Sequence, residues 1–123
     1  MTPRSTGVVP KKFKLVNRTW KVVLYSEDKI QKVLNKQFPD QEADASCIMG
    51  LCDQRTATIY LNANRHSTEE DLRHTFFHEL THALKYANGE SEHDEQEVDR
   101  LGGYLHQVMD TSTGEITWDS GQE

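Results

Sequence analysis

The chain has 123 residues, of which 35% are hydrophobic and 28% are charged, so it can form one domain with a modest core. A net charge of −6 argues against nucleic acid or an anionic membrane surface as its main partner. The sequence contains no run of 18 apolar residues, and no apolar stretch follows the basic residues near its start. We therefore expect no membrane span, no secretory signal and a cytoplasmic location.

The N-terminal third of the chain predicts a strand followed by a helix. Residues 1–12 contain two prolines and a glycine without any periodicity, and we expect a flexible segment there. The β-branched and aromatic residues 20–25 predict a strand. Residues 27–38 predict a helix that begins after Ser26 as N-cap and ends before Pro39.

A β-hairpin is expected over residues 47–61, with its second strand running from Thr56 to Leu61. The two cysteines, Cys47 and Cys52, lie in the first half of this segment. A disulfide is disfavoured in a reducing compartment, and one pair of cysteines supplies only two of the four ligands of a structural zinc site. We therefore expect buried or half-buried free thiols.

The second half of the chain predicts two helices. The first begins after Ser67 or Thr68 as N-cap and ends at Asn88-Gly89, and its apolar residues have helical spacing. The second helix covers residues 95–109 and contains the pair Gly102-Gly103. Two glycines cost a helix about 1–2 kcal/mol relative to alanine, and a close approach by another helix would explain them. Residues 115–118 could form an edge strand.

Together these elements predict a small α+β domain over residues 13–110, with a short β-sheet and two long helices. Residues 1–12 are then a flexible N-terminal segment, and residues 111–123 form a polar C-terminal tail.

The first of the two helices carries the sequence His78-Glu79-Leu80-Thr81-His82, which matches the pattern H-E-x-x-H. Two histidines four positions apart lie on one face of a helix, about 6 Å apart along its axis, so both imidazoles can reach one metal ion. Glu79 can sit beside a metal-bound water without binding the metal. The pattern therefore supplies two zinc ligands, His78 and His82, and a general base, Glu79.

A catalytic zinc site usually takes three protein ligands and keeps one position for water. The candidates for the third ligand follow the motif, in the connection to the second helix or on that helix: Glu90, Glu92, His93, Asp94, Glu95, Glu97, Asp99 and His106. Spacing favours Glu95, and Glu97 is the main alternative. Asp99 lies one turn after Glu95 and could accept the free N–H of a zinc-bound histidine.

Two segments carry a family resemblance. Residues 78–84 contain the H-E-x-x-H motif, and residues 95–102 read E-x-x-V-D-x-x-G. This combination resembles the gluzincin-type metallopeptidases and, more narrowly, the small minimal zincins of phages and bacteria, including the ImmA/IrrE-like group. The resemblance implies a zincin-like fold in which zinc is bound by His78, His82 and Glu95 and Glu79 is the base. It also implies that an edge strand, here residues 56–61, lies beside the active-site cleft.

We expect an enzyme, a zinc-dependent endopeptidase with Zn²⁺ as cofactor. Glu79 takes a proton from the zinc-bound water and later passes it to the leaving amine. A peptide or protein substrate could bind as an added strand along residues 56–61. The oxyanion needs a further donor, for which the sequence offers four candidates: His74, Tyr86, His93 and Tyr104.

Two alternatives stay open. The first is a zinc-stabilised binding or regulatory module with little or no turnover, against which Glu79 argues because a structural site has no use for a base. The second is a protease with one dedicated substrate, such as an antitoxin or a repressor. Such an enzyme would look inactive in generic assays.

Overall fold

The computed structural model describes residues 9–40 and 42–117. This part of the chain is an α+β domain with a four-stranded mixed sheet and three helices. In chain order the elements are β1 (Lys12–Leu15), β2 (Arg18–Tyr25), α1 (Glu27–Gln37), β3 (Gly50–Asp53), β4 (Thr58–Asn62), α2 (Glu69–Ala87) and α3 (Glu95–Thr111). Two short 3₁₀ turns, η2 (Ala45–Cys47) and η3 (Ala63–Arg65), lie before β3 and after β4. No helix among the described residues is long and apolar enough to cross a membrane.

The strand order in the sheet is β1-β2-β4-β3. The central strands β2 and β4 are parallel, and each outer strand is antiparallel to its neighbour. Parallel strands need a crossover connection, and here the crossover contains α1, η2 and β3. The antiparallel pair β3–β4 confirms the predicted hairpin.

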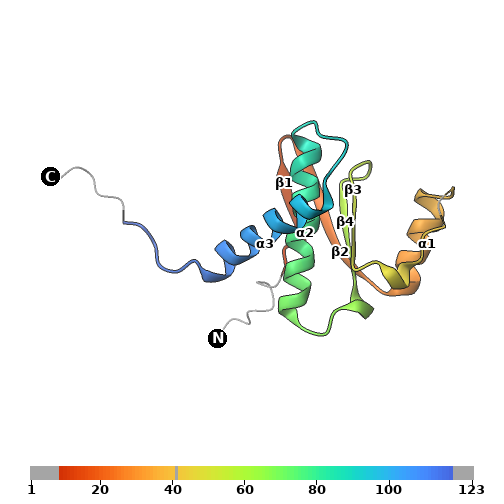
Figure 1. The fold of residues 1–123 in the computed structure, drawn as a ribbon, viewed down its shortest axis with the longest axis horizontal. Helices are drawn as coiled ribbons and strands as arrows, with labels where there is room; N and C mark the ends of the chain where they lie inside the picture. Colours follow the sequence, from red (N-terminus) through yellow and green to blue (C-terminus); the bar gives the residue numbers. More distant parts are fainter. Residues whose placement is uncertain (1–8, 41, 118–123) are drawn as a thin grey trace.

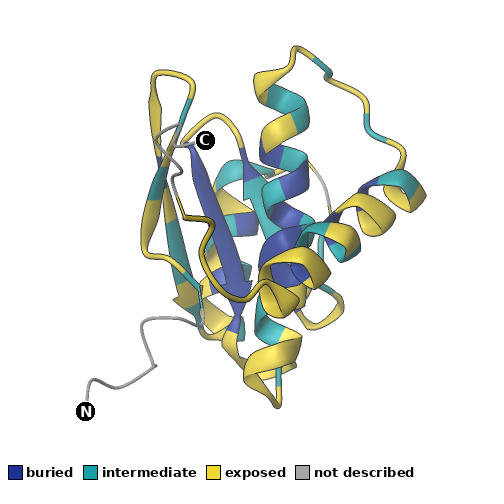
Figure 2. Cartoon of the chain, turned by 90° about the vertical axis from the view of Figure 1, so that its left-hand side faces the viewer, coloured by how far each residue is buried: buried dark blue, intermediate teal, exposed yellow. Residues whose placement is uncertain are grey.

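Helices cover the sheet from both sides (Figure 1). On one face, Ile30 and Leu34 of α1 form a small core with Ala45. On the other face, α2 packs against β3 and β4, and the larger core includes Ile59, Leu61, Phe76 and Phe77, with Trp20 of β2. Helix α3 packs across α2, and its C-terminal half extends away from the sheet with mostly exposed residues (Figures 1 and 2).

Capping interactions confirm the predicted starts of α1 and α2 and the predicted end of α2, whereas α3 runs two residues beyond its predicted end at residue 109. The side chain of Ser26 accepts the Lys29 amide at the start of α1, and Thr68 accepts the Asp71 amide at the start of α2. At the end of α2, Gly89 has a φ of +85°. Its N–H donates to the carbonyl of Tyr86, and the next amide donates to the carbonyl of Lys85, which is a Schellman motif.

The expectation that residues 56–61 form the edge strand beside the cleft is wrong. The strand in this segment, β4, lies between β2 and β3, and all five of its residues are buried. Because β4 pairs in parallel with β2, its hairpin partner β3 must take the outer position. Gly50–Asp53 is therefore the edge strand on this side of the sheet.

The two ends of the described chain differ from the predictions in their details. Strand β1 begins at Lys12, and Val9 packs against the larger core, so structure reaches into the segment expected to be flexible. At the other end, residues 115–117 form no strand, and Ile116 is almost fully exposed. Trp118, the last residue of the expected edge strand, lies outside the described residues.

Candidate metal centre

Helices α2 and α3 approach each other closely at Gly102. A Cβ atom at this position would lie 3.0 Å from the Cα of His78 and 3.1 Å from the carbonyl oxygen of Phe77, so only glycine leaves room for the backbone of α2. The neighbouring Gly103 has nothing within 4 Å of such a Cβ. The expected close approach is confirmed for Gly102 and wrong for Gly103. It places the first turn of α3 beside the motif histidines.

Three predicted ligands come together between the two helices. Nε2 of His78 lies 3.4 Å from one carboxylate oxygen of Glu95, and Nε2 of His82 lies 3.3 Å from the other. The ligand atoms of these three residues all lie within 4.8 Å of one another. We call His78, His82 and Glu95 the triad.

The spacing and chemistry of the triad fit zinc. A tetrahedral ion with bonds of about 2.0–2.1 Å has its ligand atoms about 3.3–3.4 Å apart. The two nitrogen-to-oxygen distances in the triad, each to a different oxygen of Glu95, are close to this value and exceed the 2.7–2.9 Å of a charge-assisted hydrogen bond. Two imidazoles and one carboxylate are also a common donor set of catalytic zinc. Thus the residues present could hold Zn²⁺.

Glu97, the main alternative third ligand, has another partner. Its carboxylate lies 2.5 Å from the ammonium group of Lys85, and it does not line the cavity beside the triad. Asp94 is the N-cap of α3, where its side chain accepts the amides of Gln96 and Glu97. Of the described acidic residues on this helix, Glu95 is the one that faces both histidines.

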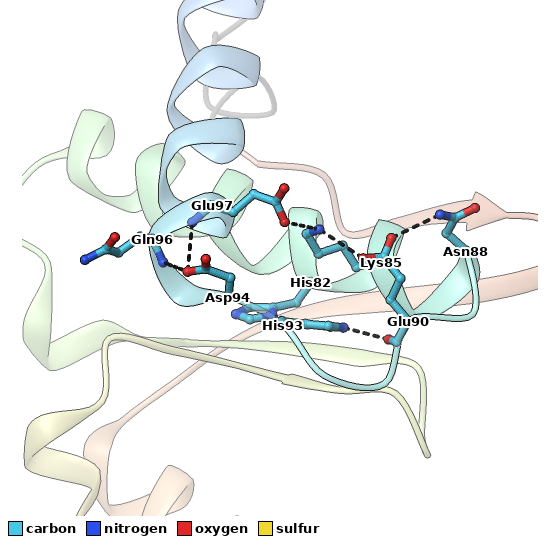
Figure 3. A network of polar contacts seen from close by, with 8 residues as sticks. All are labelled: His82, Lys85, Asn88, Glu90, His93, Asp94, Gln96 and Glu97. Atoms are coloured by element: carbon cyan, nitrogen blue, oxygen red, sulfur yellow. Dashed lines mark hydrogen bonds and ion pairs between the residues drawn. The ribbon is translucent and has the colours of Figure 1, made fainter.

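Each motif histidine has an outer partner at its Nδ1 atom. Nδ1 of His78 lies 3.4 Å from the carboxylate of Asp99, which is the position that the sequence predicts for this carboxylate. Nδ1 of His82 lies 2.7 Å from Nδ1 of His93, in the connection between α2 and α3 (Figure 3). Outer partners of this kind fix the orientation of a metal-binding imidazole and select which nitrogen faces the metal.

The base candidate Glu79 is almost completely buried, with 7% of its surface exposed. Burial raises the pKa of its carboxyl group to about 8, and the negative charge of Glu95 contributes to this shift. Burial also lowers the pKa of His82 and so favours the neutral imidazole that a metal requires. A carboxyl group with a pKa near neutrality can both accept and return a proton.

A cavity of about 520 Å³ opens beside the triad and Glu79. One wall belongs to α2 and the first turns of α3, and the other is formed by residues 47–52, which include the edge strand β3. Gly50 of this strand lies directly against α2, because a Cβ there would come within 2.7 Å of Thr75 and 3.0 Å of Glu79. Gly50 thus brings the edge of the sheet up to the base. Sequence reasoning missed this residue, although a glycine in a strand pattern often marks such an approach.

The outer wall of the cavity is held in place by Asn62, at the end of β4. Its fully buried side-chain amide donates to the carbonyl oxygens of Ala45, at 3.1 Å, and Ile48, at 2.9 Å. Its backbone N–H donates to the carbonyl of Met49. One buried residue therefore connects the central strand to the segment that forms the cavity wall.

Hydrogen bonds of His66 connect the end of β4 to a residue that lines the cavity. Its Nδ1 lies 2.7 Å from the carbonyl oxygen of Asn62, so this nitrogen donates, and its Nε2 lies 2.7 Å from the hydroxyl of Thr75. In the neutral ring Nε2 then has the lone pair, and the hydroxyl of Thr75 donates to it. Thr75 lines the cavity, so its side chain is fixed beside Gly50 and Glu79.

The four candidates for an oxyanion donor differ in their position relative to the cavity. His74 lines the cavity, with half of its side chain exposed and its Nε2 3.8 Å from Asp99. Tyr86 and His93 contact each other behind His82, outside the cavity lining. Tyr104 lines a different groove. His74 is therefore the candidate best placed to meet a ligand.

Both cysteines are free and line the same cavity. Cys52 is half-buried as expected, and burial together with the charge of Glu79 raises the pKa of its thiol. The expectation of burial is wrong for Cys47, which is exposed because it ends the 3₁₀ turn η2 at the rim of the cavity.

No family model matches the chain, and no match is found among curated proteins or solved structures. The case for a function therefore depends on the triad, the buried carboxyl group of Glu79 and the cavity.

Proposed function

We propose that the protein is a zinc-dependent peptidase. The observation that carries this proposal is the position of Glu79: a buried carboxyl group with a raised pKa lies beside three converging zinc ligands and lines an open cavity. A purely structural zinc site is usually closed by four protein ligands. Here three protein ligands would leave a bound zinc ion with a position for water, and Glu79 lies beside them, as expected for a hydrolytic centre.

In this proposal each group has a defined task. His78, His82 and Glu95 would hold the ion, which when bound would supply Lewis acidity and lower the pKa of a water molecule. Glu79 would accept a proton from the attacking water and pass it to the leaving amine. The positive charge of a bound ion favours the carboxylate form of Glu79 and so prepares it to accept the proton.

The substrate in this proposal is a peptide in extended form. Strand β3 has no strand on its outer side in the described part of the sheet, and it forms a wall of the cavity. An extended peptide can pair with such an edge through main-chain hydrogen bonds. Because Gly50 adds no side chain between this edge and Glu79, the peptide bond can approach the base closely.

The test compares the wild type with Glu79→Gln on a peptide library that represents a whole proteome, with products identified by mass spectrometry. We expect one zinc per chain in both proteins and cleavage that is slower by about 10²–10⁴-fold in the variant. Glu92→Gln is the matched control, because Glu92 is an exposed glutamate of the connection between α2 and α3 that does not line the cavity, and this variant should cleave like the wild type.

Stoichiometric zinc in a wild type that cleaves nothing in the library would favour the zinc-stabilised module or a single dedicated substrate. Intact proteins from the native host, incubated with wild type and Glu79→Gln in parallel, would distinguish these two alternatives.

A further inference from the structure

The structure assigns a positioning role to His93: we propose that it holds His82 in the one tautomer and orientation that present Nε2 to the metal. This inference depends on the proposed zinc centre and adds a residue to it. His93 lies in the connection between α2 and α3, six residues after the end of α2 at Ala87 and two before Glu95. Its Nδ1 is 2.7 Å from Nδ1 of His82, and its Nε2 is 2.8 Å from the carbonyl oxygen of Glu90 (Figure 3).

The two imidazole rings meet edge to edge. Their planes differ by 21° and their centres are 4.9 Å apart, while the two Nδ1 atoms are separated by only 2.7 Å. Rings stacked face to face would not bring two nitrogens this close. The distance between the ring centres equals the Nδ1–Nδ1 distance plus about one ring radius on each side, so the two nitrogens lie on the line between the centres. The lone pair of an imidazole nitrogen lies in the ring plane, so this arrangement is the geometry of an N–H···N hydrogen bond.

The direction of the hydrogen bonds follows from the carbonyl at the end of the chain. The Glu90 carbonyl can only accept, so Nε2 of His93 carries a proton. In the neutral ring Nδ1 of His93 then has the lone pair, and it accepts from Nδ1–H of His82. The remaining nitrogen of His82, Nε2, is left with a free lone pair. This is the atom that faces Glu95 at 3.3 Å.

The Glu90 carbonyl that accepts from His93 belongs to a residue held in place by several hydrogen bonds. The Glu90 amide donates to the carbonyl of Lys85, and the Glu90 carboxylate receives Lys85 at 3.2 Å and Asn88 at 3.0 Å. Lys85 also pairs with Glu97 of α3 (Figure 3). We call the hydrogen bonds that connect the Glu90 carbonyl, His93 and His82 the relay. The relay therefore starts from a backbone atom that is fixed between the end of α2 and the start of α3.

The two motif histidines thus have chemically different outer partners. His78 faces the carboxylate of Asp99, at 3.4 Å and with 65% of the Asp99 side chain exposed. His82 faces a neutral ring at 2.7 Å, in a part of the site where only 13% of its own side chain is exposed. Because the His82 contact is shorter and more buried, we expect it to make the larger contribution to zinc affinity.

The experiment compares His93→Asn with His93→Gln in the full-length protein. The side-chain oxygen of asparagine can take the place of Nδ1 of His93 and accept from His82. The amide of glutamine instead reaches the place of Nε2 and can donate to the Glu90 carbonyl. The zinc dissociation constant is measured by competition with a chromogenic chelator, and thermal unfolding without zinc checks that both variants fold.

A positioning role predicts a dissociation constant raised about 10–100-fold in His93→Gln and close to the wild-type value in His93→Asn. A merely structural role, exerted through the contact with Glu90, predicts the reverse order. Equal effects of the two variants would also overturn the inference.

A second measurement needs no substitution. In the zinc-loaded wild type, ¹⁵N NMR of the histidine side chains should show His93 protonated at Nε2 and not at Nδ1. Protonation at Nδ1 would overturn the inference even if zinc binds. A wild type that binds no zinc at all would instead refute the metal centre, so failure of the proposed function is distinguishable from failure of the relay.

Discussion

The interface between α2 and α3 carries two clusters of histidine and carboxylate groups. One is the triad, near the start of α3, and the other, the distal cluster, consists of Glu70, His106 and Asp110 near the start of α2 and the end of α3. In both clusters the ligand atoms lie within 4.8 Å of one another. Proximity alone therefore does not separate them.

The difference between the clusters lies in their charge balance. In the distal cluster Arg73 forms a salt bridge with Asp110, and Nε2 of His106 lies 2.9 Å from the same carboxylate. The guanidinium group of Arg73 lowers the pKa of Asp110 and supplies the positive charge that a metal would bring. In the triad Glu95 faces two imidazoles, and Glu79 lies beside them. A metal site needs negative charge that its neighbouring residues leave unbalanced, and the triad meets this condition whereas Arg73 offsets the charge of Asp110.

Removing one carboxylate from each cluster tests most directly whether the triad alone binds zinc. Glu95→Gln should raise the zinc dissociation constant by more than about 100-fold, because it deletes a ligand rather than an outer hydrogen-bond partner. Asp110→Asn should leave zinc affinity and a stoichiometry of one per chain unchanged. Isothermal titration measures both, and a second zinc that disappears with Asp110→Asn would contradict the assignment.

Zinc should also stabilise the fold through the triad alone. At a free zinc concentration about 100 times the dissociation constant, linkage predicts a gain of about 2.7 kcal/mol in the free energy of unfolding. We expect His82→Ala to abolish this gain and Asp110→Asn to retain it in thermal or denaturant unfolding with and without zinc. Equal zinc stabilisation of all three proteins would locate the ion elsewhere.

The two adjacent glycines of α3 test how closely the helices must pack near the triad. Gly102→Ala should destabilise the protein by about 1–3 kcal/mol, because the new methyl group meets the backbone of His78. Gly103→Ala should instead stabilise it by up to about 1 kcal/mol, since the site is open and alanine favours a helix. Urea unfolding of the metal-free proteins measures both, and a similar effect of the two changes would contradict the close approach.

The pH dependence of stability should run in opposite directions for the two clusters. In the metal-free protein the folded pKa of Glu79 is raised, so its contribution is present below about pH 4.5 and is lost as the pH rises toward 8. The difference in unfolding free energy between wild type and Glu79→Gln should fall by about 1.4 kcal/mol per pH unit within that window.

The folded pKa of Asp110 is lowered, so its contribution is present above the unfolded value of 3.8 and is lost as the pH falls below it. The difference between wild type and Asp110→Asn should therefore grow as the pH rises through this lower window. Chemical unfolding at a series of pH values measures both differences. Parallel pH profiles for the two variants would show that the clusters do not differ in charge balance.

Local rules were sufficient to predict the helices and the hairpin. Ser26, Thr68 and Gly89 are capping signals that act within one or two turns, and the structure has each of them in that role. The spacing of the H-E-x-x-H motif also predicts correctly that His78 and His82 share a face, because a helix fixes that geometry regardless of the rest of the fold.

Glu95 and Asp99 lie beside the motif histidines as predicted, but other features that depend on distant parts of the chain escaped prediction. The order of the strands is decided by the parallel pairing of β2 with β4, which no local pattern encodes, and β1 is too short to give a signal. Gly50, His66 and His93 obtain their roles from contacts with residues 9 to 29 positions away. Their residue types suggest many roles, and only the tertiary structure selects one.

The central position of β4 has a consequence for how the molecule opens. Helix α2, which carries His78, Glu79 and His82, packs on both β4 and β3, but within the described sheet β4 is paired on both sides, whereas β3 is a four-residue strand paired on one side only. Amide hydrogens of β4 should therefore exchange only in global unfolding, and those of β3 in smaller local openings. In the proposed site, we therefore expect the side that carries His78, Glu79 and His82 to exchange slowly, and the edge strand proposed to pair with a peptide to open without unfolding the rest.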